Sequence, residues 1–156
     1  QRIGLKGKVF NIYKIRSMRE NAENDGPQWA KKNDNRITNI GKIIRKTRID
    51  ELPQLLCIIN GNMSLIGPRP ERPEFVELID KETKYYSKRI LVKPGITGWA
   101  QVNYPYVASI KDSKNKLTFD LFYIENFSII LDLLIFFKTI KLVLQAKGAV
   151  PNKPID

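Results

Sequence analysis

The chain has 156 residues, which is the usual size of one compact domain. Its 27 lysine and arginine residues outnumber its 16 acidic residues, so the net charge is +11, and 42% of its residues are hydrophobic. This composition excludes a disordered chain and predicts a folded, basic domain. Because the sequence has no histidine, it also excludes Ser-His-Asp and Cys-His catalytic pairs and imidazole metal ligands.

The N-terminal third of the chain carries most of the excess positive charge. Residues 8–16 mix β-branched and aromatic residues with partial alternation, which predicts a strand that ends in a basic turn. Residues 20–36 are polar and are expected to form a loop. A short helix is predicted to begin at Thr38 or Asn39, with isoleucines on one face and basic residues on the other.

A second helix is predicted to begin near Asp50. Leucine and isoleucine recur at helical spacing over residues 52–59, and the Asn-Gly dipeptide at 60–61 is a stop signal. Pro53 is tolerated only where its missing N–H is not needed, which places it in the first turn. Asp50 and Glu51 are therefore expected at the N-terminus of this helix.

The central part of the chain contains a rigid loop around Arg69. Pro68 and Pro70 flank this arginine, restrict the backbone and exclude a helix there. Helical patterning returns at residues 74–90, and residues 94–102 are rich in turn-forming residues.

Leu117, Leu121 and Ile124 define a further helix, and Asp120 lies on the same apolar stripe. Burial of an unpaired carboxylate is costly, so we expect Asp120 to meet an arginine and to support the site. One α+β domain that is mostly helical, with a small β element, is the fold class that these patterns predict for residues 1–156. Cys57 lies in an apolar run and is expected to be a buried structural residue.

The most hydrophobic segment, residues 127–144, is predicted to be a helix with a narrow polar stripe at Lys138, Lys141 and Gln145. A broad apolar surface beside a lysine stripe is typical of a helix that lies in a membrane interface. A core helix with a solvated edge fits the same pattern. No run of 18 uncharged apolar residues occurs, so no segment is predicted to span a bilayer unaided.

The Asp50-Glu51 pair is the strongest candidate for chemistry. Without histidine, a carboxylate is the natural nucleophile, and a helix N-terminus holds it ionised. Helix capping alone would also explain the pair. Neighbouring cations favour a site for a phosphate ester, and Mg²⁺ is the expected metal because the available ligands are oxygens. Glu51 is its first expected ligand and Asp50 the second.

Five segments in order along the chain carry a resemblance to a known family: residues 14–18, 36–41, 45–54, 61–70 and 94–102. Together they resemble the bacterial sugar transferase family, the monotopic polyprenyl-phosphate phosphoglycosyl transferases of exopolysaccharide and glycan assembly. The resemblance covers residues 2–149. Any one of these motifs would be weak alone, and their order makes the match specific.

The resemblance implies transfer of a sugar 1-phosphate from a UDP-sugar to undecaprenyl phosphate, with release of UMP. It places this reaction at the cytoplasmic face of the bacterial inner membrane, as the first membrane step of glycan assembly. It implies that Asp50 attacks the diphosphate to form a covalent phosphosugar and that Glu51 helps to hold Mg²⁺. The expected substrate- and phosphate-binding residues are Arg69, Arg45, Arg16, Lys14, Arg48 and Gln101, and the expected structural support comes from Asp120, Pro53, Pro68 and Pro70.

Members of this family usually carry an N-terminal hydrophobic segment that enters the membrane, and we expect that segment to lie outside this chain. Two other interpretations of the sequence are a basic nucleic-acid-binding module and a non-catalytic membrane-associated module. The first explains the charge but not the motifs, since carboxylates among the cations oppose a phosphate backbone. We therefore expect a UDP-sugar, a polyprenyl phosphate and a membrane surface as partners, and no nucleic acid.

Overall fold

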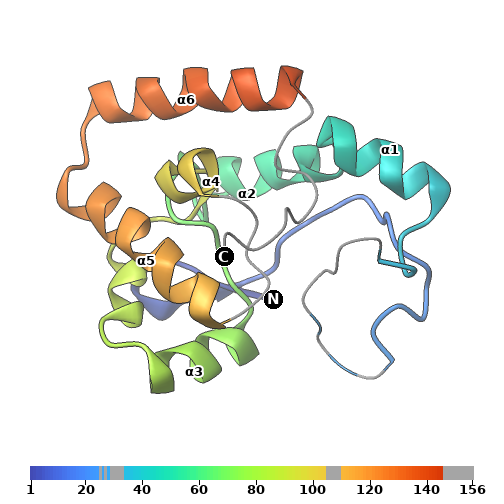
Figure 1. Ribbon diagram of the computed structural model, residues 1–156, viewed down its shortest axis with the longest axis horizontal. Coiled ribbons are helices and arrows are strands. Elements are labelled where there is room, and N and C mark those ends of the chain that lie inside the picture. The colour runs from blue at the N-terminus through green and yellow to red at the C-terminus, as the bar shows by residue number, and fades with distance from the viewer. Residues whose placement is uncertain (25, 27, 29–33, 105–109, 146–156) are drawn as a thin grey trace.

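Helices make up most of the regular structure (Figure 1). The computed structural model describes residues 1–24, 26, 28, 34–104 and 110–145. Its α-helices are α1 (Asn39–Thr47), α2 (Leu55–Ile59), α3 (Pro73–Glu82), α4 (Trp99–Asn103), α5 (Ile110–Glu125) and α6 (Ile129–Leu144). Its 3₁₀ helices are η1 (Leu5–Gly7), η2 (Ile49–Gln54) and η3 (Tyr86–Leu91), and its strands are β1 (Arg2–Ile3), β2 (Val9–Phe10), β3 (Ser64–Ile66) and β4 (Gly95–Thr97). The predicted α+β class is confirmed.

The predicted strand over residues 8–16 is wrong beyond Phe10. Strand β2 pairs antiparallel with the two-residue strand β1, so the ladder ends where its partner ends. Residues 11–16 form no strand, and most of their side chains are exposed. The N–H of Ile15 donates to the carbonyl of Asp50 at 3.1 Å, which ties this segment to the start of η2 instead.

Helix α1 begins where its capping residue predicts. The Thr38 hydroxyl accepts the N–H of Gly41 at 2.9 Å, which satisfies one of the unpaired donors of the first turn. Gly41 is buried, and a Cβ there would overlap the carbonyl of Ser17. The glycine therefore allows α1 to pack directly on the backbone of the segment that precedes it.

The helix predicted near Asp50 begins at Ile49, and its first six residues are 3₁₀ rather than α. Arg48 precedes it in the left-handed conformation, with φ of 57°. Pro53 lies inside η2, where its ring nitrogen has no hydrogen to donate to the carbonyl of Asp50. That carbonyl instead accepts the N–H of Ile15. Because Pro53 has no N–H, the Asp50 carbonyl remains available to hold residues 11–16 in place.

The segments around Gly67 and Gly95, which are rich in glycine and proline, form a parallel pair of short strands. The turn-rich pattern of residues 94–102 did not predict a strand. Strand β3 pairs with β4, and the Gly67 N–H donates to the Thr97 carbonyl at 2.9 Å. The Gly95 N–H donates in return to the carbonyl of Pro68 at 3.0 Å. A Cβ on Gly95 or on Gly98 would overlap the Gly67 backbone. These glycines are needed because two backbones meet without space for side chains.

The single helix predicted over residues 74–90 is wrong, since the structure has α3 and then η3. The chain turns between them at Tyr85, which has a φ of 66°. The turn directs Tyr86 into a core cluster with Ile79 of α3 and Leu117 of α5. Burial of this aromatic residue favours the break over continuation of the helix.

Helix α5 confirms the predicted apolar stripe, and Cys57 is buried beside Phe10 and Met63 as expected.

Helix α6 confirms the predicted helix, but its polar residues do not all face outward. Lys138 donates to the Asn103 side chain at 2.8 Å and lies 4.6 Å from the centre of the Trp99 ring. No helix among the described residues is both long and apolar enough to cross a membrane.

Candidate functional site

The carboxylate of Glu51 is the centre of a cationic cluster at the start of η2. Its Oε1 accepts from Arg69 at 2.6 Å and lies 3.5 Å from the Nζ of Lys14. Its Oε2 lies 3.8 Å from a guanidinium nitrogen of Arg48. Burial opposes ionisation, but the charges of Arg69 and Lys14 outweigh it and lower the pKa of Glu51 to about 2. Glu51 is therefore an anion at all physiological pH values.

Asp50 lies beside Glu51 but in a different electrostatic environment. Its side chain is buried, and burial together with the negative charge of Glu51 raises its pKa. The charges of Lys14, Arg45 and Arg69 act in the opposite direction. A poorly hydrated carboxylate near these cations is suited to attack on a phosphorus that the same cations hold.

A cationic cavity of about 220 Å³ adjoins this cluster on the side of Lys14. Five basic side chains line it, together with Glu23, Glu71, Gln54 and several apolar residues. The five basic residues are Arg2, Lys14, Arg45, Arg69 and Arg72. Partial burial, and then the charge of Arg69, lowers the pKa of Lys14 to about 8. Five basic side chains against two acidic ones give this lining an excess of positive charge, which favours a polyanionic ligand such as a diphosphate.

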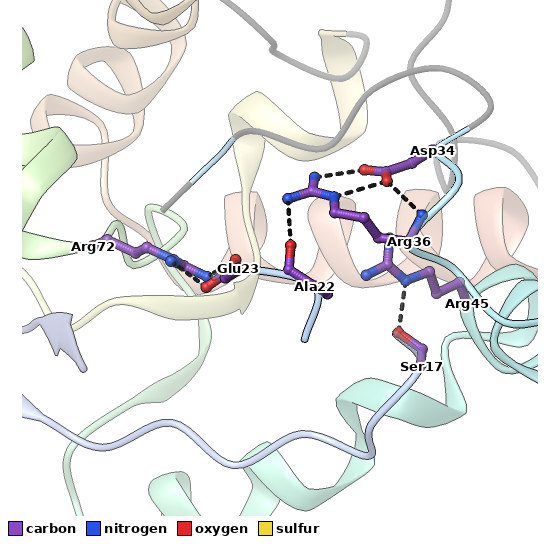
Figure 2. Close-up of polar contacts among 7 residues, drawn as sticks. All are labelled: Ser17, Ala22, Glu23, Asp34, Arg36, Arg45 and Arg72. Carbon is purple, nitrogen blue, oxygen red and sulfur yellow. Dashed lines mark hydrogen bonds and ion pairs between the residues drawn. The ribbon is translucent and has the colours of Figure 1, made fainter. Parts of the chain in front are cut away.

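Polar contacts hold the described part of the segment before α1 against this cavity (Figure 2). The Arg72 guanidinium donates two hydrogen bonds, of 2.6 and 2.9 Å, to the Glu23 carboxylate. Arg72 directly precedes α3, so these bonds join the segment to the start of that helix. Arg45 donates to the Ser17 hydroxyl at 2.7 Å, and Arg36 pairs with Asp34 at 2.6 Å. Figure 2 shows these contacts, and Met18, Glu23 and Gln28 of the same segment belong to the lining of the cationic cavity.

Asp120 meets an arginine, as expected, and this arginine is Arg89 of η3. The Arg89 Nε donates to Asp120 at 2.8 Å, one terminal nitrogen donates to the Tyr86 hydroxyl, and the other donates to the carbonyl of Arg69 at 2.7 Å. Asp120 is buried, and its charge is paired as expected. Through Arg89 it supports the backbone of Arg69, while Pro68 and Pro70 restrict that backbone on both sides.

Gln101 lies on the other side of the cluster. It lines a second cavity, of about 280 Å³, together with Arg48 and Glu51. Both polar atoms of its amide are buried and have no hydrogen-bond partner in the described part of the structure. Buried amides without partners are rare in native proteins and require an explanation.

The structure therefore brings together Lys14, Arg48 and Arg69 around the predicted pair and places Arg45 close enough to act on Asp50. It does not bring Arg16 there, because that side chain pairs with Glu20 on the surface at 2.9 Å. The sequence reasoning did not select Arg2, Arg72, Glu71 and Arg89. Their positions depend on contacts between distant segments. Glu71 and Arg72 nevertheless come directly after Pro70, which flanks Arg69. Their closeness to Arg69 in the chain could have indicated that they belong to the site.

Asp50 and Glu51 fit Mg²⁺ by their chemistry, because they are hard oxygen ligands next to each other. Among the residues that the structure describes, no three acidic, cysteine or histidine side chains gather into a metal-binding group. The cations around Glu51 also oppose a bare divalent ion. Two carboxylates suffice for Mg²⁺ when substrate phosphates supply further oxygens, so this donor set fits a metal that binds together with a diphosphate.

Comparison with known proteins shows the family. The model for bacterial sugar transferases matches residues 1–146. The chain belongs to this family. A relative from Aeromonas hydrophila, the UDP-N-acetylgalactosamine-undecaprenyl-phosphate N-acetylgalactosaminephosphotransferase, is 51% identical over 95% of this chain and 35% of its own length.

The names of two further relatives give different sugars. The UDP-glucose:undecaprenyl-phosphate glucose-1-phosphate transferase of Xanthomonas campestris pv. campestris is 40% identical over 96% of this chain and 31% of its own length. The undecaprenyl-phosphate galactose phosphotransferase of Salmonella typhimurium is 40% identical over 96% of this chain and 33% of its own length. The chain thus spans about a third of the length of these relatives.

Proposed function

We propose that this bacterial sugar transferase transfers a sugar 1-phosphate from a UDP-sugar to undecaprenyl phosphate and releases UMP. The observation that carries the proposal is the pair of adjacent carboxylates, Asp50 and Glu51, among Lys14, Arg48 and Arg69 at the edge of the cationic cavity. The names of the relatives support undecaprenyl phosphate as the acceptor and a nucleotide sugar as the donor. The reaction would be the first membrane step of exopolysaccharide or glycan assembly.

We assign the diphosphate of the donor to the cationic cavity. Arg69 and Lys14 would bind its phosphate oxygens and stabilise the negative charge that develops on the leaving phosphate. Arg45 lines the same cavity and would add a third positive charge. Asp50 and Glu51 would hold Mg²⁺ together with these phosphates, and the metal would supply further neutralisation of charge.

The Asp50 carboxylate is the proposed nucleophile. One of its oxygens forms a bond to the phosphorus that carries the sugar, while the bond from that phosphorus to the bridging oxygen breaks and UMP departs with the electron pair. An oxygen of undecaprenyl phosphate then attacks the same phosphorus, which releases Asp50 and forms the lipid diphosphate sugar. A covalent intermediate allows a soluble donor and a membrane lipid to react at one carboxylate in turn.

Asp50→Asn tests this proposal most directly, because asparagine keeps the shape of the side chain and removes its charge. The wild-type chain is mixed with Mg²⁺ and a panel of UDP-sugars without acceptor, beginning with UDP-N-acetylgalactosamine, and its intact mass is measured. We expect a sugar-phosphate adduct on the wild type and none on Asp50→Asn, with UDP binding retained in both. Full turnover by Asp50→Asn would disprove the assignment of the nucleophile.

We further propose that the outward face of α6 lies on the membrane, at the cytoplasmic side of the bacterial inner membrane. Ile129 and Ile130 are each about 80% exposed on this helix, and Phe137 is 64% exposed. Asp132 and Lys138 instead bind inward, to Tyr123 and Asn103. Lys141 is exposed near the C-terminal end of the helix, and an outward face of apolar residues with a lysine beside them is suited to a membrane interface.

A further inference from the structure

The second cavity lies beneath α6 and has a lining quite different from that of the cationic cavity. We call it the α6 cavity and define it by Thr47, Arg48, Glu51, Leu52, Leu55, Leu65, Ile96, Thr97, Gln101, Val102, Thr139, Leu142 and Val143. Aliphatic side chains make up more than half of this lining. Its polar groups include Arg48, Glu51 and the Gln101 amide that has no hydrogen-bond partner among the described residues.

The α6 cavity reaches from Glu51 to apolar residues at the surface. Glu51 belongs to its lining and also binds Lys14 and Arg69 of the cationic cavity. Leu52 and Leu55 also belong to its lining and are about half exposed. Figure 1 shows α6 running alongside α2 and α4, and all three helices contribute to the lining: Leu55 from α2, Val102 from α4, and Leu142 and Val143 from α6.

We propose that the α6 cavity receives the isoprenoid segment next to the phosphate of the polyprenyl phosphate acceptor. This inference rests on the proposed function and goes beyond it, because it assigns a separate place to each substrate. A nucleoside or a sugar would need several hydrogen-bond partners. The three threonine hydroxyls of this lining already bond to one another or to helix carbonyls, and the aliphatic side chains offer no such bonds. A branched hydrocarbon chain needs none and gains from burial.

The polar end of the α6 cavity suits the phosphate of the same lipid. Arg48 provides a positive charge there, and the amide nitrogen of Gln101 is a buried donor. A phosphate oxygen would accept from that donor and relieve the cost of leaving it unpaired. With the isoprenoid chain beneath α6, the phosphate would lie at the Glu51 end of the cavity, and the neighbouring Asp50 would carry the sugar phosphate.

The arrangement gives the two substrates separate binding places, while both half-reactions take place at the phosphorus bound to Asp50. The donor would enter the cationic cavity, and the acceptor would enter through the apolar rim of the α6 cavity, with Glu51 between them. A substitution that fills the α6 cavity should therefore slow the second half-reaction and spare the first. This prediction separates an acceptor site from a general role of α6 in the fold.

Val143→Phe tests the proposal, with Leu144→Phe as its matched control. Val143 lines the α6 cavity, whereas the adjacent Leu144 is 81% exposed on the same helix. Each variant is placed in lipid nanodiscs with undecaprenyl phosphate. Adduct formation from the UDP-sugar without acceptor is measured first, and transfer from the preformed adduct to the lipid is measured second. Thermal stabilisation by undecaprenyl phosphate provides a readout that needs no turnover.

We expect Val143→Phe to form the adduct at the wild-type rate and to transfer it about 10-fold more slowly, with lost thermal stabilisation by the lipid, while Leu144→Phe matches the wild type. Normal adduct formation also shows that the variant folds. Equal slowing of both half-reactions, or equal behaviour of the two variants, would overturn the proposal. If the wild type formed no adduct but only Val143→Phe lost stabilisation by the lipid, the proposed function would fail and the acceptor site would stand.

Discussion

Asp50 and Glu51 are neighbours in the chain, yet their surroundings shift their pKa values in opposite directions. Burial and the charge of Glu51 raise the pKa of Asp50, whereas Arg69 and Lys14 overcome burial and lower that of Glu51 to about 2. Adjacent carboxylates with different environments commonly have different roles. The structure thus favours Glu51 as the fixed charge that gathers the cations and Asp50 as the group that reacts.

Lys14 gives the site a pH dependence that can be measured. Its pKa is lowered to about 8, so its positive charge is present below that pH and is lost as the pH rises through it. We expect the affinity for Mg²⁺-UDP to fall about 10-fold between about pH 7 and about pH 9.5 in the wild type. Lys14→Arg keeps its charge over this range, so its affinity should stay nearly constant.

Isothermal titration calorimetry with UDP and Mg²⁺ measures this effect without turnover. Arg16→Lys is the control, because Arg16 lies on the surface and pairs with Glu20 away from the cluster. The control should follow the wild-type pH profile. A flat profile in the wild type, or an unchanged slope in Lys14→Arg, would exclude Lys14 as a ligand of the diphosphate.

At the scale of elements, buried Arg89 joins η3, α5 and the loop that carries Arg69. It binds Asp120 of α5 and the carbonyl of Arg69 at the same time. A lysine can replace only part of this arrangement, because a single ammonium group lacks the planar fork of the guanidinium. Arg89 is accordingly a positioning residue that acts through the backbone of Arg69.

Arg89→Lys should slow adduct formation by about 10-fold through misplacement of Arg69. Kinetics of UMP release give kcat and KM separately, and thermal unfolding reports the effect on stability. Lys88→Met on the same 3₁₀ helix is the control, since Lys88 lies over the ring of Tyr85 and not against the Arg69 loop. A fall in thermal stability with an unchanged rate of UMP release would show that Arg89 serves the fold alone.

At the scale of the whole molecule, many exposed aliphatic side chains belong to helices on one side. In Figure 1, α6, α1 and α2 lie on one side and α3 on the other. Exposed aliphatic residues are numerous on the first side, including Ile40, Ile59 and Ile130. The excess positive charge of the N-terminal third would add an attraction to anionic lipid headgroups of about 1 kcal/mol for each well-placed lysine or arginine.

Ile130→Glu should weaken binding to vesicles that contain anionic lipid, because it places a charge on the outward face of α6. Ile130 is 81% exposed, so the substitution should leave the fold intact. Leu78→Glu is the control, since Leu78 is also exposed and belongs to α3, the helix that lies on the opposite side of the molecule in Figure 1. Co-sedimentation with vesicles measures both. Equal binding of the two variants would place the membrane surface elsewhere.

The sequence by itself determined the family, the carboxylate pair and most of its cations, because these depend on residues that lie close together in the chain. The Thr38 cap, the start of the helix near Asp50 and the helices over 110–125 and 129–144 follow from local capping and apolar spacing. Restriction by Pro68 and Pro70 is also local. Short-range sterics and periodicity suffice for features of this kind.

Only the tertiary structure decided how distant segments meet. The parallel pairing of β3 with β4 and the contact of Arg89 with the Arg69 carbonyl join residues that local patterns treat separately. The same holds for the strand predicted over 8–16, which ended at Phe10 because its partner was too short. The inward direction of Lys138 also depends on what α6 packs against. Pairing and burial depend on the partner, and periodicity within one segment does not specify it.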